Sequence, residues 1–144
     1  MTKQISGLAW HLHHDQLVEW CNDYDERVAY IKTSKPLSEQ ATRLRLFQMV
    51  KSPPAKLKPG PSAAAYNKAR AVLDKARLAR ATRPAAYVKA LSNYDKAAKV
   101  LDQEWINYKK TFFAARFELR DLHKVECPDC PWNGKTIFPE GAGP

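Results

Sequence analysis

The sequence predicts an all-α protein: an elongated helical bundle with a long antiparallel helical hairpin and a short C-terminal turn of the zinc-knuckle type. Apolar residues recur at helical spacing near the N-terminus, a seven-residue repeat runs through the middle, and two cysteines stand three residues apart near the end. The length of 144 residues suits a single domain with a buried core. Within that domain we expect an N-terminal helical pair (1–51), a connector (52–61), a long basic hairpin (62–126) and a cysteine knuckle with a tail (127–144).

The first helix is predicted from the apolar stripe between Trp10 and Ile31. Steps of four and three residues place its members on one helix face. They are Trp10, His14, Leu17, Cys21, Tyr24, Val28 and Ile31. Pro36 suits the first turn of a second helix, which we expect to end near Lys51.

The connector at 52–61 contains four prolines and one glycine. Proline removes a backbone donor and clashes with the preceding helical turn, so this stretch is not helical. We interpret it as a semi-rigid link between the helical pair and the hairpin.

The hairpin is predicted from Tyr or Leu residues that recur every seven positions, with alanines three residues later. Small residues on such a seam let two helices approach closely. Pro84 is favoured at the first position of a helix and costs about 3 kcal/mol inside one. We therefore expect helices over 62–81 and 84–125, packed antiparallel. A single helix kinked at Pro84 is the alternative, because no glycine marks a turn.

A structural zinc site is predicted at the end of the chain. Cys127 and Cys130 have the C-x-x-C spacing that directs two thiolates at one ion, and His123 precedes them by four residues. Four ligands are usual, and we expect His14 to be the fourth, with His11 as its substitute. Such a site would join the first helix to the tail. Two reduced thiols beside a core histidine are the alternative, and Pro131, where knuckles often have glycine, favours it.

Beyond the cysteines, Asn133-Gly134 predicts a tight turn. Thr136 to Phe138 would then return as a short strand.

Positive charge is concentrated in the middle of the chain. Residues 51–116 contain 15 Lys or Arg against four acidic residues, a balance of +11 within a net charge of +9. Lines of charge along the hairpin would suit nucleic acid or an acidic protein surface. We predict contacts from Lys68, Arg70, Lys75, Arg77, Lys89 and Lys96. A solvated lysine-rich face is the plain alternative, and the Tyr–Ala seam offers a third role in homo-oligomer assembly or binding to a host protein.

The stretch HLHHD offers an enzymatic alternative, because His11, His13 and Asp15 resemble the ligands of metal-dependent hydrolases and nucleases. Such ligands usually follow strands, with more histidines downstream. This chain has one later histidine, His123, and no phosphate-binding glycine loop. We therefore expect a non-enzymatic binding protein.

The sequence also bears on localisation. No run approaches eighteen apolar residues, and the N-terminus lacks the layout of a secretory signal. Three cysteines are too few, and odd in number, for a disulfide framework. We expect a soluble protein in the cytoplasm of a bacterial host cell, with no membrane partner.

The runs GLAWHLHHDQLVEWCNDYDERVAYIKTSKP and EQATRLRLFQMV, the Tyr-Asp-Lys-Ala heptads and the ending HKVECPDCPWNGKTIFP resemble a family of uncharacterised proteins from bacteria and their phages. The resemblance covers both ends and, more loosely, the repeats between them. It implies a phage or prophage accessory protein whose helical arm differs in length among members. It implies no activity and no functional residue.

Overall fold

The computed structural model describes residues 5–82 and 84–139, which form four helices and a three-stranded antiparallel sheet. The prediction of an all-α protein is therefore wrong. The strands are β1 (Gly7–Trp10), β2 (Val18–Cys21) and β3 (Gln48–Met49), and β1 lies between the other two. The helices are α1 (Tyr24–Ser34), α2 (Leu37–Leu46), α3 (Ala63–Thr82) and α4 (Pro84–Glu126).

The predicted helix over 10–31 is replaced by a β-hairpin followed by α1. Leu8 pairs with Trp20 and Trp10 with Val18, and the residues between the strands form a turn. α1 starts only after Asp23, whose carboxylate accepts the backbone N–H of Glu26 at 3.1 Å. An N-cap of this kind satisfies an N–H that has no partner inside the helix.

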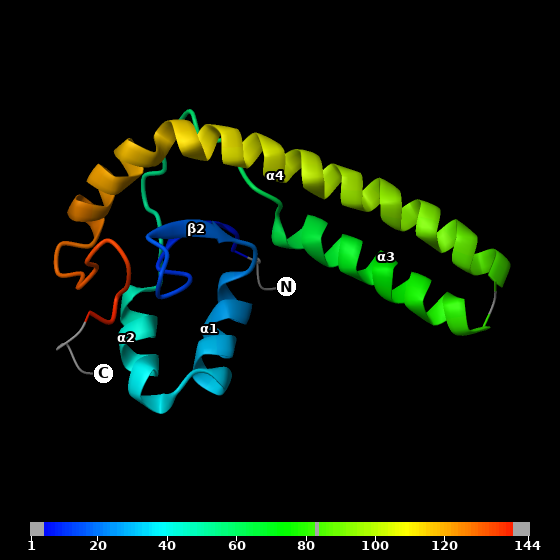
Figure 1. The fold of residues 1–144 in the computed structure, drawn as a ribbon, viewed down its shortest axis with the longest axis horizontal. Helices are drawn as coiled ribbons and strands as arrows, with labels where there is room; N and C mark the ends of the chain where they lie inside the picture. The colour runs from blue at the N-terminus through cyan, green and yellow to red at the C-terminus, as the bar shows by residue number, and fades with distance from the viewer. Residues whose placement is uncertain (1–4, 83, 140–144) are drawn as a thin grey trace.

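The sheet has two buried faces, which explains why its sequence does not alternate between apolar and polar residues. Leu8, Trp10 and Val18 pack with Tyr108, Ala115 and Leu119 of α4. On the other face, Ala9 and Cys21 pack with Ile31 of α1 and Phe47. Figure 1 shows the sheet between α4 above and the pair α1 and α2 below. Strands that are buried on both faces can be apolar at consecutive positions. The spacing of such apolar residues does not distinguish a strand from part of a helix.

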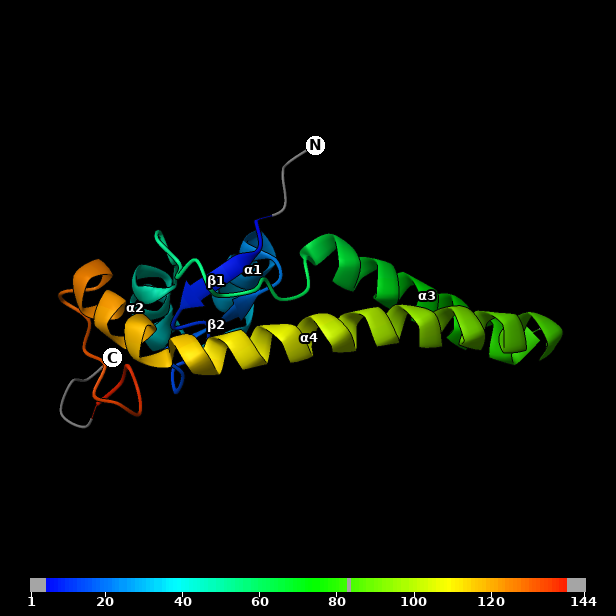
Figure 2. The ribbon, with the colours of Figure 1, turned by 90° about the horizontal axis from the view of Figure 1, so that it is seen from above.

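The long antiparallel hairpin is confirmed, since α3 and α4 run side by side and are separated near Pro84 (Figure 1). Ala69 and Ala76 are 6% and 2% exposed, so the alanine seam is used inside the hairpin. Figure 2 shows α4 continuing without a break from the hairpin into the part of the molecule that contains the sheet. We call the hairpin residues 63–100 the arm and the remainder the head.

The connector is fixed against the sheet by Trp20. Its indole N–H donates to the carbonyl of Pro61 at 2.6 Å, and its ring lies against Gly60. A Cβ at Gly60 would come within 2.7 Å of that ring, so this position requires glycine. The proline-rich segment thereby sets where α3 starts.

The C-terminal segment returns to the N-terminal hairpin without forming the predicted strand at 136–138. The Asn133 side chain accepts the backbone N–H groups of Lys135 and Thr136, both at 2.9 Å, which closes the predicted turn. Ile137 then donates its N–H to the carbonyl of His14 at 2.9 Å. This bond goes to a loop, and a strand needs a continuous ladder. Across the described ranges, no helix has the length and apolarity that crossing a membrane requires.

Candidate metal centre

Three side chains from distant parts of the chain meet beside the C-terminal end of α4. The Nε2 atom of His11 lies 3.0 Å from Nε2 of His123 and 3.1 Å from Sγ of Cys130. One potential ligand atom from each residue lies within 4.8 Å of the other two. Among the residues that the structure describes, this is the one group of three or more His, Cys, Asp or Glu that could hold a metal ion.

His11 is held by the turn that follows β1. Its backbone has φ 51°, and its N–H donates to the carbonyl of Leu17 at 3.0 Å. Its Nδ1 lies 3.2 Å from the carbonyl of Gln16. Because a carbonyl only accepts, Nδ1 carries the hydrogen and the lone pair of Nε2 faces the cluster. A backbone carbonyl on the remote ring nitrogen is the usual arrangement of a metal-binding histidine.

His123 and Cys130 come from the last turn of α4 and the loop beyond it. The His123 ring contacts those of Trp10 and His11 edge-on, each with centroids 5.1 Å apart. The N–H of Cys127 donates to the carbonyl of His123 at 2.8 Å, and that of Cys130 donates to the carbonyl of Cys127 at 3.2 Å. These consecutive turns bring Cys130 back beside the helix end.

Burial sets the protonation of the cluster. It lowers the pKa of His11 to about 4, with the neighbouring His123 adding to the effect, and it lowers the pKa of His123 as well. Burial raises the pKa of the Cys130 thiol. Both imidazoles are therefore neutral near pH 7, the form that binds metals. The single lone pair of His11 Nε2 cannot fully accept both an N–H from His123 and an S–H from Cys130, whereas a cation would use all three ligand atoms.

His14 does not join the cluster. Its side chain is exposed, and its Nδ1 lies 3.4 Å from the hydroxyl oxygen of Thr136. The structure thus brings together His11, the predicted substitute ligand, with His123 and Cys130. His11 lies in the turn that follows β1. The prediction of a helix over 10–31 excluded this turn and therefore favoured His14.

Cys127 also lies outside the group of three. Its side chain packs against the apolar core beneath α4, and burial raises its pKa to about 11, with the adjacent Cys130 adding to the effect. It nevertheless shares one tight turn with Cys130.

Within the described ranges, the stretch HLHHD contributes one residue, His11, to the group of potential ligands. The Nδ1 atom of His13 lies 2.6 Å from the carboxylate of Glu19, and the side chains of His13 and Asp15 are exposed. Of the three residues named for a hydrolase, His11 is among the side chains that converge as potential ligands, whereas His13 and Asp15 are not.

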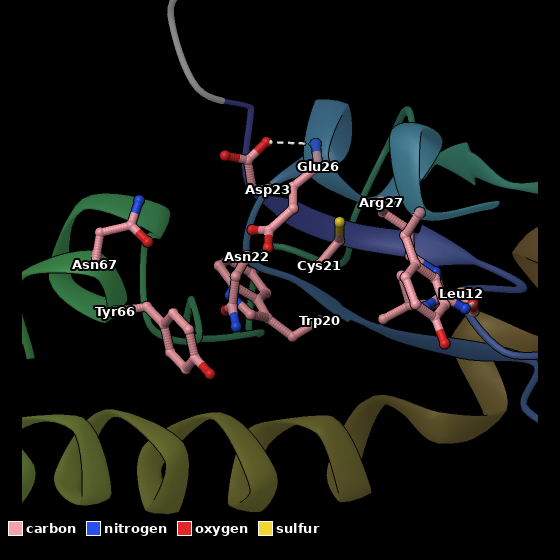
Figure 3. Close-up of a pocket in the computed structure, with 10 residues that line it drawn as sticks. Leu12, Trp20, Cys21, Asn22, Asp23, Glu26, Arg27, Tyr66 and Asn67 are labelled. Atoms are coloured by element: carbon pink, nitrogen blue, oxygen red, sulfur yellow. Dashed lines mark hydrogen bonds between the residues drawn. The ribbon is translucent and has the colours of Figure 1, made fainter. Parts of the chain in front are cut away.

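A separate hollow of about 310 Å³ lies between β2, the start of α1 and the start of α3. Figure 3 shows Tyr66 and Asn67 on one side and Asn22, Glu26 and Arg27 on the other. The guanidinium of Arg27 donates to the carbonyl of Leu12, while its Nε and the Oδ1 of Asn22 have no hydrogen-bond partner. Both atoms are shielded from solvent, so a ligand in the hollow would not reach them.

The cations predicted to bind nucleic acid lie on the surface of the arm. They are Lys68, Arg70, Lys75, Arg77, Lys89 and Lys96, and every one of these side chains is exposed. Within the described part of the chain, the ion pairs involve head residues, and none includes any of these six. The arm therefore presents exposed positive charge that forms no ion pair with a carboxylate of the described residues.

Comparisons with protein-family models, with curated proteins and with solved structures find no match for this chain.

Proposed function

We propose that this chain is a non-enzymatic nucleic-acid-binding protein, in which a zinc-stapled head holds out a basic helical arm. The observation that carries the proposal is the set of exposed, unpaired cations on α3 and the first half of α4. The resemblance to bacterial and phage proteins is compatible with an accessory role of this kind.

The arrangement of these cations suits a polyanion. Lys68 and Lys75 are seven residues apart on α3, as are Arg70 and Arg77, and Lys89 and Lys96 repeat the spacing on α4. Like charges in rows repel one another, and a phosphate backbone removes that repulsion while releasing its condensed counterions. Contacts of this type give affinity with little preference for sequence.

The metal that we propose for the cluster is zinc. Imidazole nitrogen and cysteine sulfur are its usual ligands, and tetrahedral zinc separates two bound nitrogens by about 3.3 Å. The distance of 3.0 Å between the Nε2 atoms of His11 and His123 needs only a small expansion to reach that value. Rotation of the Cys127 side chain would supply the fourth ligand from the same turn as Cys130.

The proposed role of this zinc is structural, because the ion would join three separate segments of the head. His11 belongs to the N-terminal β-hairpin, His123 to the end of α4 and Cys130 to the C-terminal loop. His11 and His123 are only 2% and 7% exposed, which leaves little room for a substrate. Metal binding would then contribute directly to the stability of the head.

Nucleic-acid binding is tested by fluorescence anisotropy with a labelled 20-base-pair duplex and a single strand of the same length. The arm variant Lys68→Gln/Lys75→Gln/Lys89→Gln should weaken binding to both and lower the slope of log K against log salt by about 2 to 3. The matched control Lys32→Gln/Lys58→Gln/Lys135→Gln removes the same charge from exposed head positions. Absence of binding at low salt, or equal effects of the two triple variants, would contradict the proposal.

A further inference from the structure

An exposed aromatic patch lies on the part of α4 that crosses the head. Phe113 and Phe117 are 65% and 56% exposed, although they are one helical turn apart on a helix whose other side is buried by the sheet. Ala115 and Leu119, on that other side, are completely buried. Two large neighbouring apolar side chains left in water are typical of a binding surface.

Two arginines stack on these rings. The guanidinium of Arg116 lies 3.9 Å from the ring centroid of Phe113 and 4.4 Å from that of Phe117. Arg120 lies 5.3 Å from the Phe117 ring. We call Phe113, Arg116, Phe117 and Arg120 the Phe–Arg platform. Arg116 donates to the carbonyl of Phe113 at 2.6 Å. Neither arginine makes an ion pair within the described ranges, so the platform joins flat apolar surface to positive charge.

The acidic residues beside the platform are already paired. Glu118 lies 2.8 Å from Lys56, and Asp121 lies 3.5 Å from Lys124. The exposed Lys109 and Lys110 add further positive charge one turn before Phe113. The surroundings of the platform therefore favour an anionic partner.

The platform is continuous with the cations of the arm. One heptad position of α4 contains Lys89, Lys96, Gln103, Lys110, Phe117 and Lys124, and all six are exposed. A second contains Lys99, Ile106, Phe113 and Arg120, again all exposed. Successive residues seven apart are turned by only about 20° around a straight helix, so each row winds gradually along α4 from the lysines of the arm to Phe113 or Phe117. Figure 2 shows the single helix that carries both.

We infer that the Phe–Arg platform stacks the unpaired bases of a single-stranded nucleic acid whose phosphates follow the lysines of α4. This inference rests on the proposed function and narrows its substrate class. Phenyl and guanidinium planes stack on any base, and aromatic residues interleaved with positive charge are the usual means of binding single strands. A duplex hides its base faces and would contact only the cations.

The test compares three probes of 20 nucleotide units: dT20, an abasic strand with the same backbone, and a duplex. Wild-type protein should bind dT20 more tightly than the abasic strand. Phe113→Ala/Phe117→Ala should weaken dT20 binding about 10- to 100-fold and leave duplex and abasic binding within about twofold. The matched control Val88→Ala/Val100→Ala, which trims two exposed apolar side chains of the same helix, should bind all three like the wild type.

The outcomes separate the two proposals. Equal wild-type affinity for dT20 and the abasic strand, or no effect of the phenylalanine substitutions, would overturn the platform and leave arm-mediated binding intact. Failure to bind any probe at low salt would remove both. A dimer of the wild-type protein that dissociates in Phe113→Ala/Phe117→Ala, measured by light scattering, would assign the platform to a second copy of the chain and likewise overturn the inference.

Discussion

The indole N–H of Trp10 donates to the Glu126 carboxylate at 2.8 Å, across 116 residues of sequence. The same carboxylate accepts the backbone N–H of Lys51 at 3.0 Å and that of Ser52 at 3.1 Å. A negative charge at the C-terminal end of a helix is unfavourable on its own, and three donors offset that cost. Glu126 thus joins β1, the end of α4 and the start of the connector, close in sequence to His123 and Cys130 of the candidate metal cluster.

Removing that carboxylate should destabilise the head. Glu126→Ala leaves the Trp10 indole and two backbone N–H groups without their acceptor, and we expect a loss of about 2 to 3 kcal/mol in the free energy of unfolding. Urea denaturation measures this loss in the free energy of unfolding. The control is Glu118→Gln, which breaks an ion pair whose two side chains are about half exposed and should cost under about 0.5 kcal/mol. Equal losses in the two variants would contradict the role assigned to Glu126.

Substitution of a residue in the cluster should lower the zinc content, whereas substitution of a histidine outside the cluster should not. Protein purified without added metal should contain about one zinc per chain, and chelator should lower its melting temperature. His11→Ala and Cys130→Ser should lose most of the zinc, whereas His14→Ala, which removes an exposed histidine, should retain it. Elemental analysis measures the zinc content of the three variants. Full zinc content in His11→Ala would contradict the site, and a lowered content in Cys127→Ser would identify the fourth ligand.

Titration of Cys21 should lower the free energy of unfolding at alkaline pH. Burial raises its pKa from 9.0 to about 11 in the fold. Between these values the unfolded chain loses the thiol proton and the folded chain keeps it, so stability falls as pH rises from 9 to 11, by about 2 kcal/mol. Cys21→Ala is less stable at pH 8 because it leaves a cavity, but it lacks this titration. The gap between the two proteins in urea denaturation should therefore narrow toward pH 11, and a constant gap would contradict the assignment.

The alanine seam of the hairpin should tolerate no larger side chain. Ala76 is 2% exposed, so Ala76→Leu forces α3 and α4 apart and should cost about 1 to 3 kcal/mol. Ala71→Leu adds the same atoms at an exposed position of α3 and should change stability by under about 0.5 kcal/mol. Thermal denaturation followed by circular dichroism compares them. A seam that accepted leucine at Ala76 as readily as at Ala71 would contradict the close packing.

The sequence by itself determined the two helices of the hairpin and the meeting of the two ends. Heptad spacing with alanine, and a proline that suits only the start of a helix, are local signals, and α3 and α4 follow them closely. The prediction that the N-terminal segment and the cysteine tail lie together is confirmed by the contacts of His11 with Cys130 and of His14 with Ile137.

Only the tertiary structure decided that residues 7–10 and 18–21 are strands and that His11, in place of His14, faces His123. Trp10 and Cys21 are apolar residues on opposite faces of a sheet that α4 covers on one side and α1 on the other. Burial on both faces removes the two-residue alternation by which a strand is recognised, and the remaining apolar spacing matches a helix. The turn between the strands, with its positive φ at His11, then points a different histidine inward. That choice depends on which elements cover the sheet, and those elements lie up to 116 residues away.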